Sequence, residues 1–306
     1  MTRDNEPIPP LSTQQLLYLR AASRAPSWTE AASELGVTQS ALSQGIAELE
    51  RRLGLTLFER AGRRRVLSPA GHEVLLQADR VLAQASDLGR LAGQLRRGER
   101  GTYRLGLIDS AAVATCRPAL AAVRELAGDA LHVTVDTSVP LTRGVQRGEL
   151  DLAVVVADNA ALRSGGSGRA FEATVTTATV AEESMVVVAP AAVGRGALDD
   201  PSRWGPWVMP PAGSTTRRLI EGALRLRGAD PTTTLESSNP TVLLSMVELG
   251  LGWAVLPDHT RGLGSDGGAV ADVVEAEELV RRRLVAVTRS GCPPDPRTER
   301  FLTSLA

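Results

Sequence analysis

Five uncharged polar residues are spaced so that they could read the edges of DNA base pairs. Amide side chains can pair with adenine in the major groove, and hydroxyl groups can hydrogen-bond bases or phosphates. A solvated helix face carries the same residue types, so the stretch by itself leaves both interpretations open. The residues lie at the front of TQSALSQGIAELERRLGLTLFER, positions 38 to 60: Thr38, Gln39, Ser40, Ser43 and Gln44.

A group of arginines follows at the end of this stretch. Arg60, Arg63, Arg64 and Arg65 fall within six positions, and such a group can hold the phosphates of a nucleic acid. The first 100 residues carry 14 arginines against 11 acidic residues, whereas the rest of the chain carries 20 against 24. Positive charge therefore gathers in the N-terminal third, although a charge run is also typical of an ordinary solvated surface.

A second set of polar residues follows predicted strands further along the chain. Each places a hydroxyl or amide at the start of a predicted helix, where free backbone amides and the positive helix end attract anions. Together they indicate a carboxylate-bearing small molecule, although each alone is more simply a helix cap. Asp109 and Arg217 would also suit a zwitterion, or merely a solvated surface. The three segments are Asp109-Ser110, Gly213-Ser214-Thr215 and Ser238-Asn239-Pro240.

Three short helices and a hairpin are predicted to present the first polar group. Helices are expected over 12–25, 29–35 and about 39–52, with Thr38 capping the third. Leucine and isoleucine residues in this third helix recur at steps of four, three and four, which predicts a buried stripe and turns the polar residues outward. After it, LTLFERAGRRRVLS predicts a two-stranded wing that carries the arginines. The stripe consists of Leu42, Ile46, Leu49 and Leu53.

A long helix with a heptad repeat is predicted next. Ser68 caps it and Pro69 takes its first position. Its apolar residues follow alternating steps of four and three, which is typical of a coiled coil that joins two chains. Packing against the chain's own later part is the alternative. The seam consists of Val74, Ala78, Val81, Ala85, Leu88, Ala92 and Leu95.

From Tyr103 the pattern changes to apolar strands separated by helices, which predicts a parallel α/β domain. In open α/β sheets, ligands bind beyond the carboxyl ends of the strands. Strands are expected at YRLGLID, LHVTVDT, DLAVVV, MVVVAP, GWAVLP and RRLVAVT, and helices near 111–127, 141–147, 215–227 and 240–250.

Composition excludes several classes of protein. The chain has 306 residues, enough for two or three domains. No basic leader precedes an apolar segment, and no apolar run reaches the ~18 residues of a membrane span, so we expect a cytoplasmic protein with no membrane partner. The two cysteines, Cys116 and Cys292, have no metal-ligand or CxxC spacing, so we expect no metal site and no cofactor. They could form a redox pair only if the fold brought them together.

Catalysis has little support in the sequence. His72, His132 and His259 lie in no metal-binding motif and beside no plausible nucleophile, and the chain contains no GxSxG, HExxH or P-loop. We therefore expect a protein that is not an enzyme.

The N-terminal segment SWTEAASELGVTQSALSQGIAELERRLGLTLFERAGRRRVLSPAG, with the linker helix and α/β domain behind it, resembles the LysR-type transcriptional regulators over almost the whole chain. The pattern AAxxLxVTQxAxSxxIxxLExxLGxxLFxR, from Ala31 to Arg60, is highly specific. QRGELDLAV and VELGLGWAVLP match more loosely.

The resemblance implies a mixed fold of class α/β with three parts. These are a winged helix-turn-helix over 1–68, a linker and dimerisation helix over 69–101, and a two-lobed, periplasmic-binding-protein-like effector domain over 102–306. Lobe one would comprise 103–180 plus 275–306, and lobe two 181–274. Such a protein binds a pseudo-palindromic operator in double-stranded DNA as a dimer or tetramer and responds to a small-molecule effector, which the helix caps suggest is anionic.

The resemblance also assigns residues to roles. It places Thr38, Gln39, Ser40, Ser43 and Gln44 on the recognition helix and the wing arginines on the DNA backbone. It adds Ser138 to the effector cleft and brings the three capped segments together there, so the expected effector residues are Ser110, Ser138, Ser214, Thr215 and Asn239. Closure of the lobes on the effector could then tilt the linker helices.

One departure from the family pattern affects the recognition helix. The usual SRQI is Ser43, Gln44, Gly45 and Ile46 here. Glycine inside a helix costs ~1 kcal/mol relative to alanine, so we expect a softer helix and a different operator preference. A DNA-binding architectural protein without a ligand, or a redox-responsive regulator, remains the alternative to an effector-binding regulator.

Overall fold

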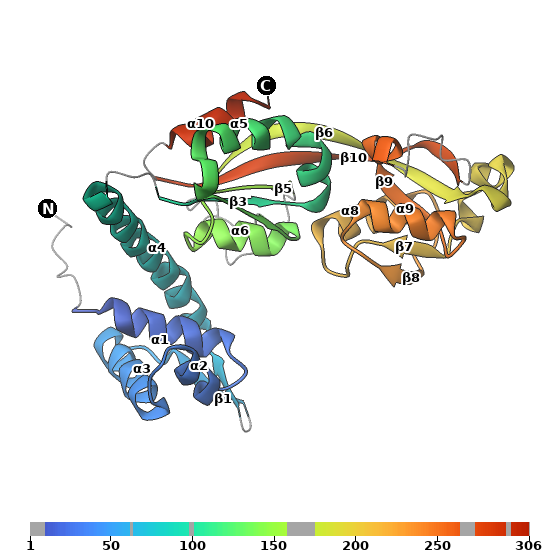
Figure 1. The fold of residues 1–306 in the computed structure, drawn as a ribbon. Coiled ribbons are helices and arrows are strands. Elements are labelled where there is room, and N and C mark those ends of the chain that lie inside the picture. Colours follow the sequence, from blue (N-terminus) through green and yellow to red (C-terminus); the bar gives the residue numbers. More distant parts are fainter. Residues whose placement is uncertain are drawn as a thin grey trace, which may run out of the picture. The chain divides into compact units, whose positions relative to one another are not determined.

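The computed structural model describes residues 10–61, 64–97, 101–157, 175–263, 273–291 and 295–305 (Figure 1). The chain divides into two compact units. The first comprises Met1–Glu99 with Gln146–Gly148, and the second comprises Arg100–Val145 with Glu149–Ala306. No helix among the described residues is long and apolar enough to cross a lipid bilayer.

The N-terminal unit contains the predicted helices and the predicted wing. Serine and threonine side chains cap the first three helices, since Ser12, Ser27 and Thr38 each accept a hydrogen bond from a first-turn amide. Gly54, with φ of 66°, ends the third in the left-handed conformation. The elements are α1 (Thr13–Arg24), α2 (Trp28–Glu34), α3 (Gln39–Leu53), β1 (Phe58–Ala61), β2 (Arg64–Leu67) and α4 (Pro69–Arg97).

The core of this unit contains the predicted apolar stripe of α3. Leu42, Ile46 and Leu49 are fully buried, and Leu53 packs at the edge of the same cluster. Leu19 and Ala31 fill the opposite side. Burial of the stripe fixes the rotation of α3, so the polar side chains of its first two turns face outward.

The wing is fastened to α3 and α4 by two polar side chains. The Glu50 carboxylate accepts hydrogen bonds from the backbone amides of Leu57 (2.7 Å) and Phe58 (3.2 Å). The Ser68 hydroxyl donates to the Thr56 carbonyl (2.6 Å) and accepts from the Gly71 amide (2.9 Å). The hairpin therefore leaves the helices at a defined position.

The heptad seam of α4 divides into two parts. Val74 and Ala78 pack in the core of the N-terminal unit, against residues that precede α4 rather than against the later part of the chain. Val81 and Leu88 are 46% and 68% exposed, and Ala85 and Ala92 are exposed as well. The side chain of Leu95 lies outside the described residues. Only the later part of the seam is thus open to a second chain.

The second unit is built on one six-stranded sheet in the order β4-β3-β5-β10-β6-β9. β3, β4 and β5 are parallel, whereas β10 runs antiparallel to both β5 and β6. The expected short strands MVVVAP and RRLVAVT are parts of these two long strands, so the sheet is mixed rather than parallel. The bounds are β3 (Tyr103–Leu107), β4 (Leu131–Val135), β5 (Leu152–Val156), β6 (Val175–Pro190), β9 (Ala254–Pro257) and β10 (Val273–Arg289).

Separate apolar clusters form at the two ends of β6 and β10, one in lobe one and two in lobe two. In lobe one, α5 (Arg117–Ala127) and α10 (Pro296–Thr303) cover one face of the sheet and α6 (Ser138–Gln146) lies on the other (Figure 1). Lobe two packs α8 (Thr215–Leu226), α9 (Pro240–Glu248) and the two-stranded sheet of β7 (Trp207–Met209) and β8 (Thr233–Glu236) beside β6 and β9. The sequence patterns missed β7, β8 and α10.

Short helical turns complete the described chain. A π-helix, η1 (Ala111–Thr115), begins directly after Ser110, where a regular α-helix was expected. Such segments are frequent at functional sites because they redirect side chains. The 3-10 turns are η2 (Gly128–Ala130), η3 (Ala191–Val193), η4 (Arg195–Asp199), η5 (Pro201–Arg203) and η6 (Asp258–Leu263).

Candidate nucleic-acid interface and ligand pocket

The polar residues predicted to read DNA lie at the N-terminal end of α3. Thr38, Gln39, Ser40 and Gln44 are exposed, and Ser43 is half-buried. The Thr38 oxygen accepts a hydrogen bond from the Ala41 amide (3.1 Å), so its role in the cap is settled, while its own proton remains available. The arrangement can offer hydroxyl and amide groups to a groove that admits a helix.

Gly45 is a close-packing position on this helix. A Cβ atom there would lie 2.4 Å from Cδ2 of Tyr18, because the tyrosine ring of α1 rests on the backbone of α3. Tyr18 is buried, and Gln14 donates a hydrogen bond to its hydroxyl (2.7 Å). The glycine therefore brings α1 and α3 together, whereas the sequence alone indicated only a weakened helix.

The wing holds two of its arginines side by side. Arg60 and Arg65 are exposed and are direct partners in the β1–β2 register. Cζ of Arg65 lies 4.2 Å from the centroid of Trp28, and the Trp28 ring packs edge-on against Phe58 at 5.1 Å. Like charges opposite each other destabilise a hairpin. The side chain of Arg64 and all of Arg63 lie outside the described residues.

Two other basic residues of α3 share one carboxylate. The Glu48 carboxylate accepts from Arg51 and from Arg52. These hydrogen bonds hold the pKa of Glu48 at about 2. The two arginines at the C-terminal end of α3 thus differ from the wing arginines, which face each other.

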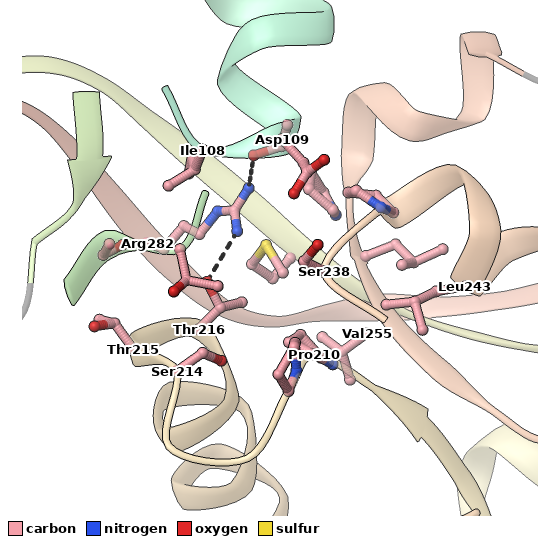
Figure 2. A pocket seen from close by; sticks show the side chains of 18 of the residues that line it. Ile108, Asp109, Pro210, Ser214, Thr215, Thr216, Ser238, Leu243, Val255 and Arg282 are labelled. Atoms are coloured by element: carbon pink, nitrogen blue, oxygen red, sulfur yellow. Dashed lines mark hydrogen bonds between the residues drawn. The ribbon is translucent and has the colours of Figure 1, made fainter. Parts of the chain in front are cut away.

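A pocket in the second unit lies between the two lobes, where β3 and β4 of lobe one end near the first turns of α8 and α9 (Figure 2). Its empty volume is about 520 Å³, open space at its mouth included. Four of the five predicted effector residues line it, Ser110, Ser138, Ser214 and Thr215. Asn239 does not, although its neighbours Ser238 and Pro240 do.

Several predicted effector residues also hold the pocket together. Ser138 Oγ accepts from the Val156 amide (3.1 Å), which ties α6 to the end of β5. Ser214 caps α8 through the Arg217 amide (3.2 Å), and Asn239 caps α9 through Thr241 (2.9 Å). The helix-cap interpretation is therefore correct for Ser214 and Asn239. The first-turn backbone amides of both helices have no carbonyl partner within the helix. They are therefore exposed as donors at the N-terminal ends of α8 and α9.

A buried ion pair forms the floor of the pocket. Arg282 of β10 and Glu183 of β6 are almost inaccessible, and Nη2 of Arg282 lies 2.6 Å from Oε2 of Glu183. Nη2 also donates to Ser110 Oγ (2.6 Å). Thr115, at the end of η1, donates to the other Glu183 oxygen (2.6 Å). Arg282 lines the pocket; it is a functional candidate that sequence reasoning missed, because no local motif connects it with Glu183.

Arg217 has a different role from the one expected. Its buried guanidinium donates to Glu221, to the Pro210 carbonyl (3.0 Å) and to Thr233 Oγ1 (2.6 Å). It does not line the pocket, whereas Pro210 does. Arg217 therefore shapes the loop before α8, and the guanidinium at the pocket belongs to Arg282.

The cysteine at 116 is poorly suited to redox sensing. Cys116 is buried, and burial, with a smaller contribution from the charge of Glu183, raises the pKa of its thiol to about 12. A protonated thiol is a weak nucleophile. Cys292 lies outside the described residues. Within the described part of the chain, no group of three or more histidine, cysteine or acidic residues could hold a metal ion.

Two family models match the chain. The LysR substrate binding domain matches residues 96–306, and the lysR family of bacterial regulatory helix-turn-helix proteins matches residues 13–72. The HTH-type transcriptional regulator EstR of Acinetobacter baylyi is 30% identical over 290 residues, which cover 92% of each chain. CbbR of Rhodospirillum rubrum is 27% identical over 285 residues, which cover 92% of this chain and 91% of that protein.

Solved structures share the fold. A full-length OxyR variant from Pseudomonas aeruginosa has a TM-score of 0.61 at 22% identity and covers 96% of this chain and 94% of its own. CbnR in complex with its target DNA has a TM-score of 0.57 at 19% identity. The match covers 96% of this chain and 99% of the CbnR chain. The helix-turn-helix model describes bacterial regulatory proteins, and the relatives EstR and CbbR are transcriptional regulators rather than enzymes. The chain therefore belongs to the LysR family of bacterial transcriptional regulators.

Proposed function

We propose that this regulator binds a pseudo-palindromic operator through residues 1–68, pairs through the helix at 69–101, and responds to a small carboxylate-bearing effector bound by residues 102–306. The observation that carries the DNA-binding part is the outward polar face at the start of α3, next to a wing on which Arg60 and Arg65 face each other. That repulsion is relieved when phosphate lies between or beside the two guanidinium groups. A regulator of this kind acts on the chromosome, and this supports the cytoplasm as its location.

The DNA-reading residues are Thr38, Gln39, Ser40, Ser43 and Gln44, with Arg60, Arg63, Arg64 and Arg65 on the backbone. A salt-dependent gel shift with the DNA upstream of the protein's own gene tests this assignment. Gln44→Ala should weaken binding to that DNA and leave binding to unrelated DNA unchanged. Gln84→Ala, which removes an exposed glutamine from α4, is the matched control. Equal, purely salt-governed binding of wild type to both DNAs would contradict sequence reading at that site.

Oligomerisation is assigned to the exposed later part of the α4 seam. Val81 and Leu88 are large apolar side chains that stay accessible in a single chain, and a second copy of the helix would bury them at heptad spacing. Leu88→Glu should therefore lower the oligomeric state in light scattering. A variant that assembles like wild type would exclude the seam as the contact.

The effector part of the proposal rests on the pocket. Ser110, Ser138, Ser214 and Thr215 bring hydroxyl groups from both lobes to one space, and Arg282 adds a guanidinium at its floor. Hydroxyl groups, first-turn amides and a guanidinium together are suited to a carboxylate. Asn239 contributes through the cap of α9 rather than by contact.

Ligand between the lobes would favour their closed arrangement and so bias the spacing of the DNA-reading heads. Footprints on the operator, measured with and without ligand on the full chain, test this coupling. Identical footprints at every concentration of a ligand that binds would contradict it.

A further inference from the structure

We propose that the effector carries a positive charge beside its carboxylate and has an apolar body, which makes it a zwitterion of the amino-acid class. The inference rests on the effector pocket of the proposed function and names the ligand class that this pocket fits.

The charges around the pocket do not suit a ligand that is only anionic. Its charged lining residues are two carboxylates, Asp109 and Asp136, and one guanidinium, Arg282. The Glu183 carboxylate, which does not line the pocket, already accepts hydrogen bonds from Nε and Nη2 of that guanidinium. A purely anionic ligand would therefore meet two negative charges and a positive charge that is largely compensated.

Both aspartates lie at one rim of lobe one. β3 and β4 are parallel neighbours in which Leu107 pairs with Val135, and the Asp136 amide donates to the Leu107 carbonyl (3.2 Å). Asp109 is half-buried, and within the described residues its carboxylate has no hydrogen-bond or ion-pair partner. A carboxylate that is partly removed from water is stabilised by a cation close to it, so this rim is the place for an ammonium group.

The position for the ligand carboxylate lies next to the rim that carries Asp109. Nη2 of Arg282 is bonded to Ser110 and Glu183, but Nη1 makes only a long contact with Thr216 Oγ1, 3.4 Å. Figure 2 shows the guanidinium between Asp109 and Thr216. Nη1 therefore keeps donor capacity at the first turn of α8, where the helix end is also positive.

The two positions are neighbours in the lining of the pocket. Asp109 and Ser110 are consecutive, so their Cα atoms are about 3.8 Å apart, and Arg282 is bonded to the second of them. Beside its hydroxyl-bearing residues the pocket has one apolar wall, which fits a branched or aromatic body. This wall consists of Ile108, Met185, Pro210, Pro211, Pro240, Leu243, Val255, Leu256 and Pro257.

Calorimetry on the full-length protein tests the proposal with matched ligand pairs. The amino acids L-valine, L-leucine, L-isoleucine, L-methionine and L-phenylalanine are each compared with the acid that lacks the amino group. The best-binding amino acid should bind at least ten times more tightly than its deaminated acid. Asp109→Asn should bring that ratio close to one by weakening the amino acid, with the acid bound at least as well as by wild type. Asp129→Asn, an exposed aspartate of η2, should leave the ratio unchanged.

The outcomes separate the two proposals. If deaminated acids bind as tightly as amino acids, or if Asp109→Asn preserves the preference, the zwitterion inference is wrong and the carboxylate effector stands. If no compound of either series binds to saturation, the inference is overturned together with the carboxylate effector on which it rests.

Discussion

Arg282 and Glu183 are direct partners in the register of β10 and β6, with Nη2 and Oε2 2.6 Å apart and both side chains buried. The pair lies on the two strands that the lobes share. From there it reaches Ser110 and Thr115 in lobe one and Thr216 in lobe two. Any rearrangement of one lobe against the other must therefore keep or exchange these hydrogen bonds.

Removal of one partner should be more harmful than removal of both. Glu183→Gln leaves a buried guanidinium without its counter-charge, which typically costs ~3–5 kcal/mol. The double variant Glu183→Gln, Arg282→Met removes both charges and should recover a large part of that loss. Urea denaturation of the three proteins measures the difference. A single variant as stable as wild type would show that water or neighbouring groups compensate the charge.

Gly45 should resist replacement although alanine is the better helix former. In an open helical position Gly→Ala gains roughly 0.5–1 kcal/mol. At position 45 the added Cβ meets Cδ2 of Tyr18 at 2.4 Å, so Gly45→Ala should lower stability and weaken operator binding. The reason is that the tyrosine ring must leave its place between α1 and α3.

Two further variants isolate that contact. Tyr18→Leu combined with Gly45→Ala should recover operator binding, because the smaller side chain frees the space. Gly222→Ala in α8, where nothing lies within 4 Å of the new methyl group, should raise the thermal midpoint slightly. If Gly45→Ala also raises it, the close packing of Tyr18 has no energetic weight.

The same glycine illustrates where sequence reasoning succeeds and where it ends. The stripe of α3, the cap at Thr38 and the wing could be predicted because they depend on residues a few positions apart. The consequence of Gly45 depends on a ring 27 positions earlier in the sequence. The residues near Gly45 in the sequence indicate its low helix propensity but not its contact with Tyr18.

In the second unit, too, features that depend on nearby residues could be predicted and features that depend on distant residues could not. The apolar half of β6 and the RRLVAVT segment of β10 could be recognised, but the first half of β6 is polar and mostly exposed, which hid the full length of that strand. Arg282 and Glu183 are 99 positions apart, and only strand pairing brings them together. The hydroxyl residues at strand ends could be predicted to meet in the pocket because the family fold supplies that arrangement.

Arg65 should contribute to DNA affinity through charge, held in place by Trp28. Arg65→Gln should weaken binding to all DNA sequences and reduce the salt dependence, the slope of log K against log salt, by about 1 for a lost phosphate contact.

Arg51→Gln is the control for this experiment. Arg51 is exposed, like Arg60 and Arg65, but is paired with Glu48 (2.6 Å), so its loss should change the salt slope much less. Gel shifts at a series of salt concentrations measure both slopes. Equal changes for the two variants would mean that the wing has no special part in phosphate contact.

Cys116 should be inert in the folded protein. Burial raises the pKa of its thiol from 9.0 to about 12, so the thiolate that reacts with disulfide reagents or peroxide is scarce at neutral pH. In a Cys292→Ser background, a thiol titration should therefore detect Cys116 only after denaturation. Peroxide should leave operator binding unchanged. Fast reaction of the native thiol would instead support the redox-responsive alternative.

The raised pKa of Cys116 also has a consequence for stability at high pH. The unfolded chain ionises this thiol near pH 9, whereas the folded chain keeps it protonated up to about pH 12. The stabilising contribution is therefore fully present below about pH 9 and is lost as pH rises toward 12. Cys116→Ala should flatten the decline in stability over that window, measured by urea denaturation from pH 8 to pH 11. An unchanged pH profile would show that Cys116 ionises as readily in the folded chain as in the unfolded one.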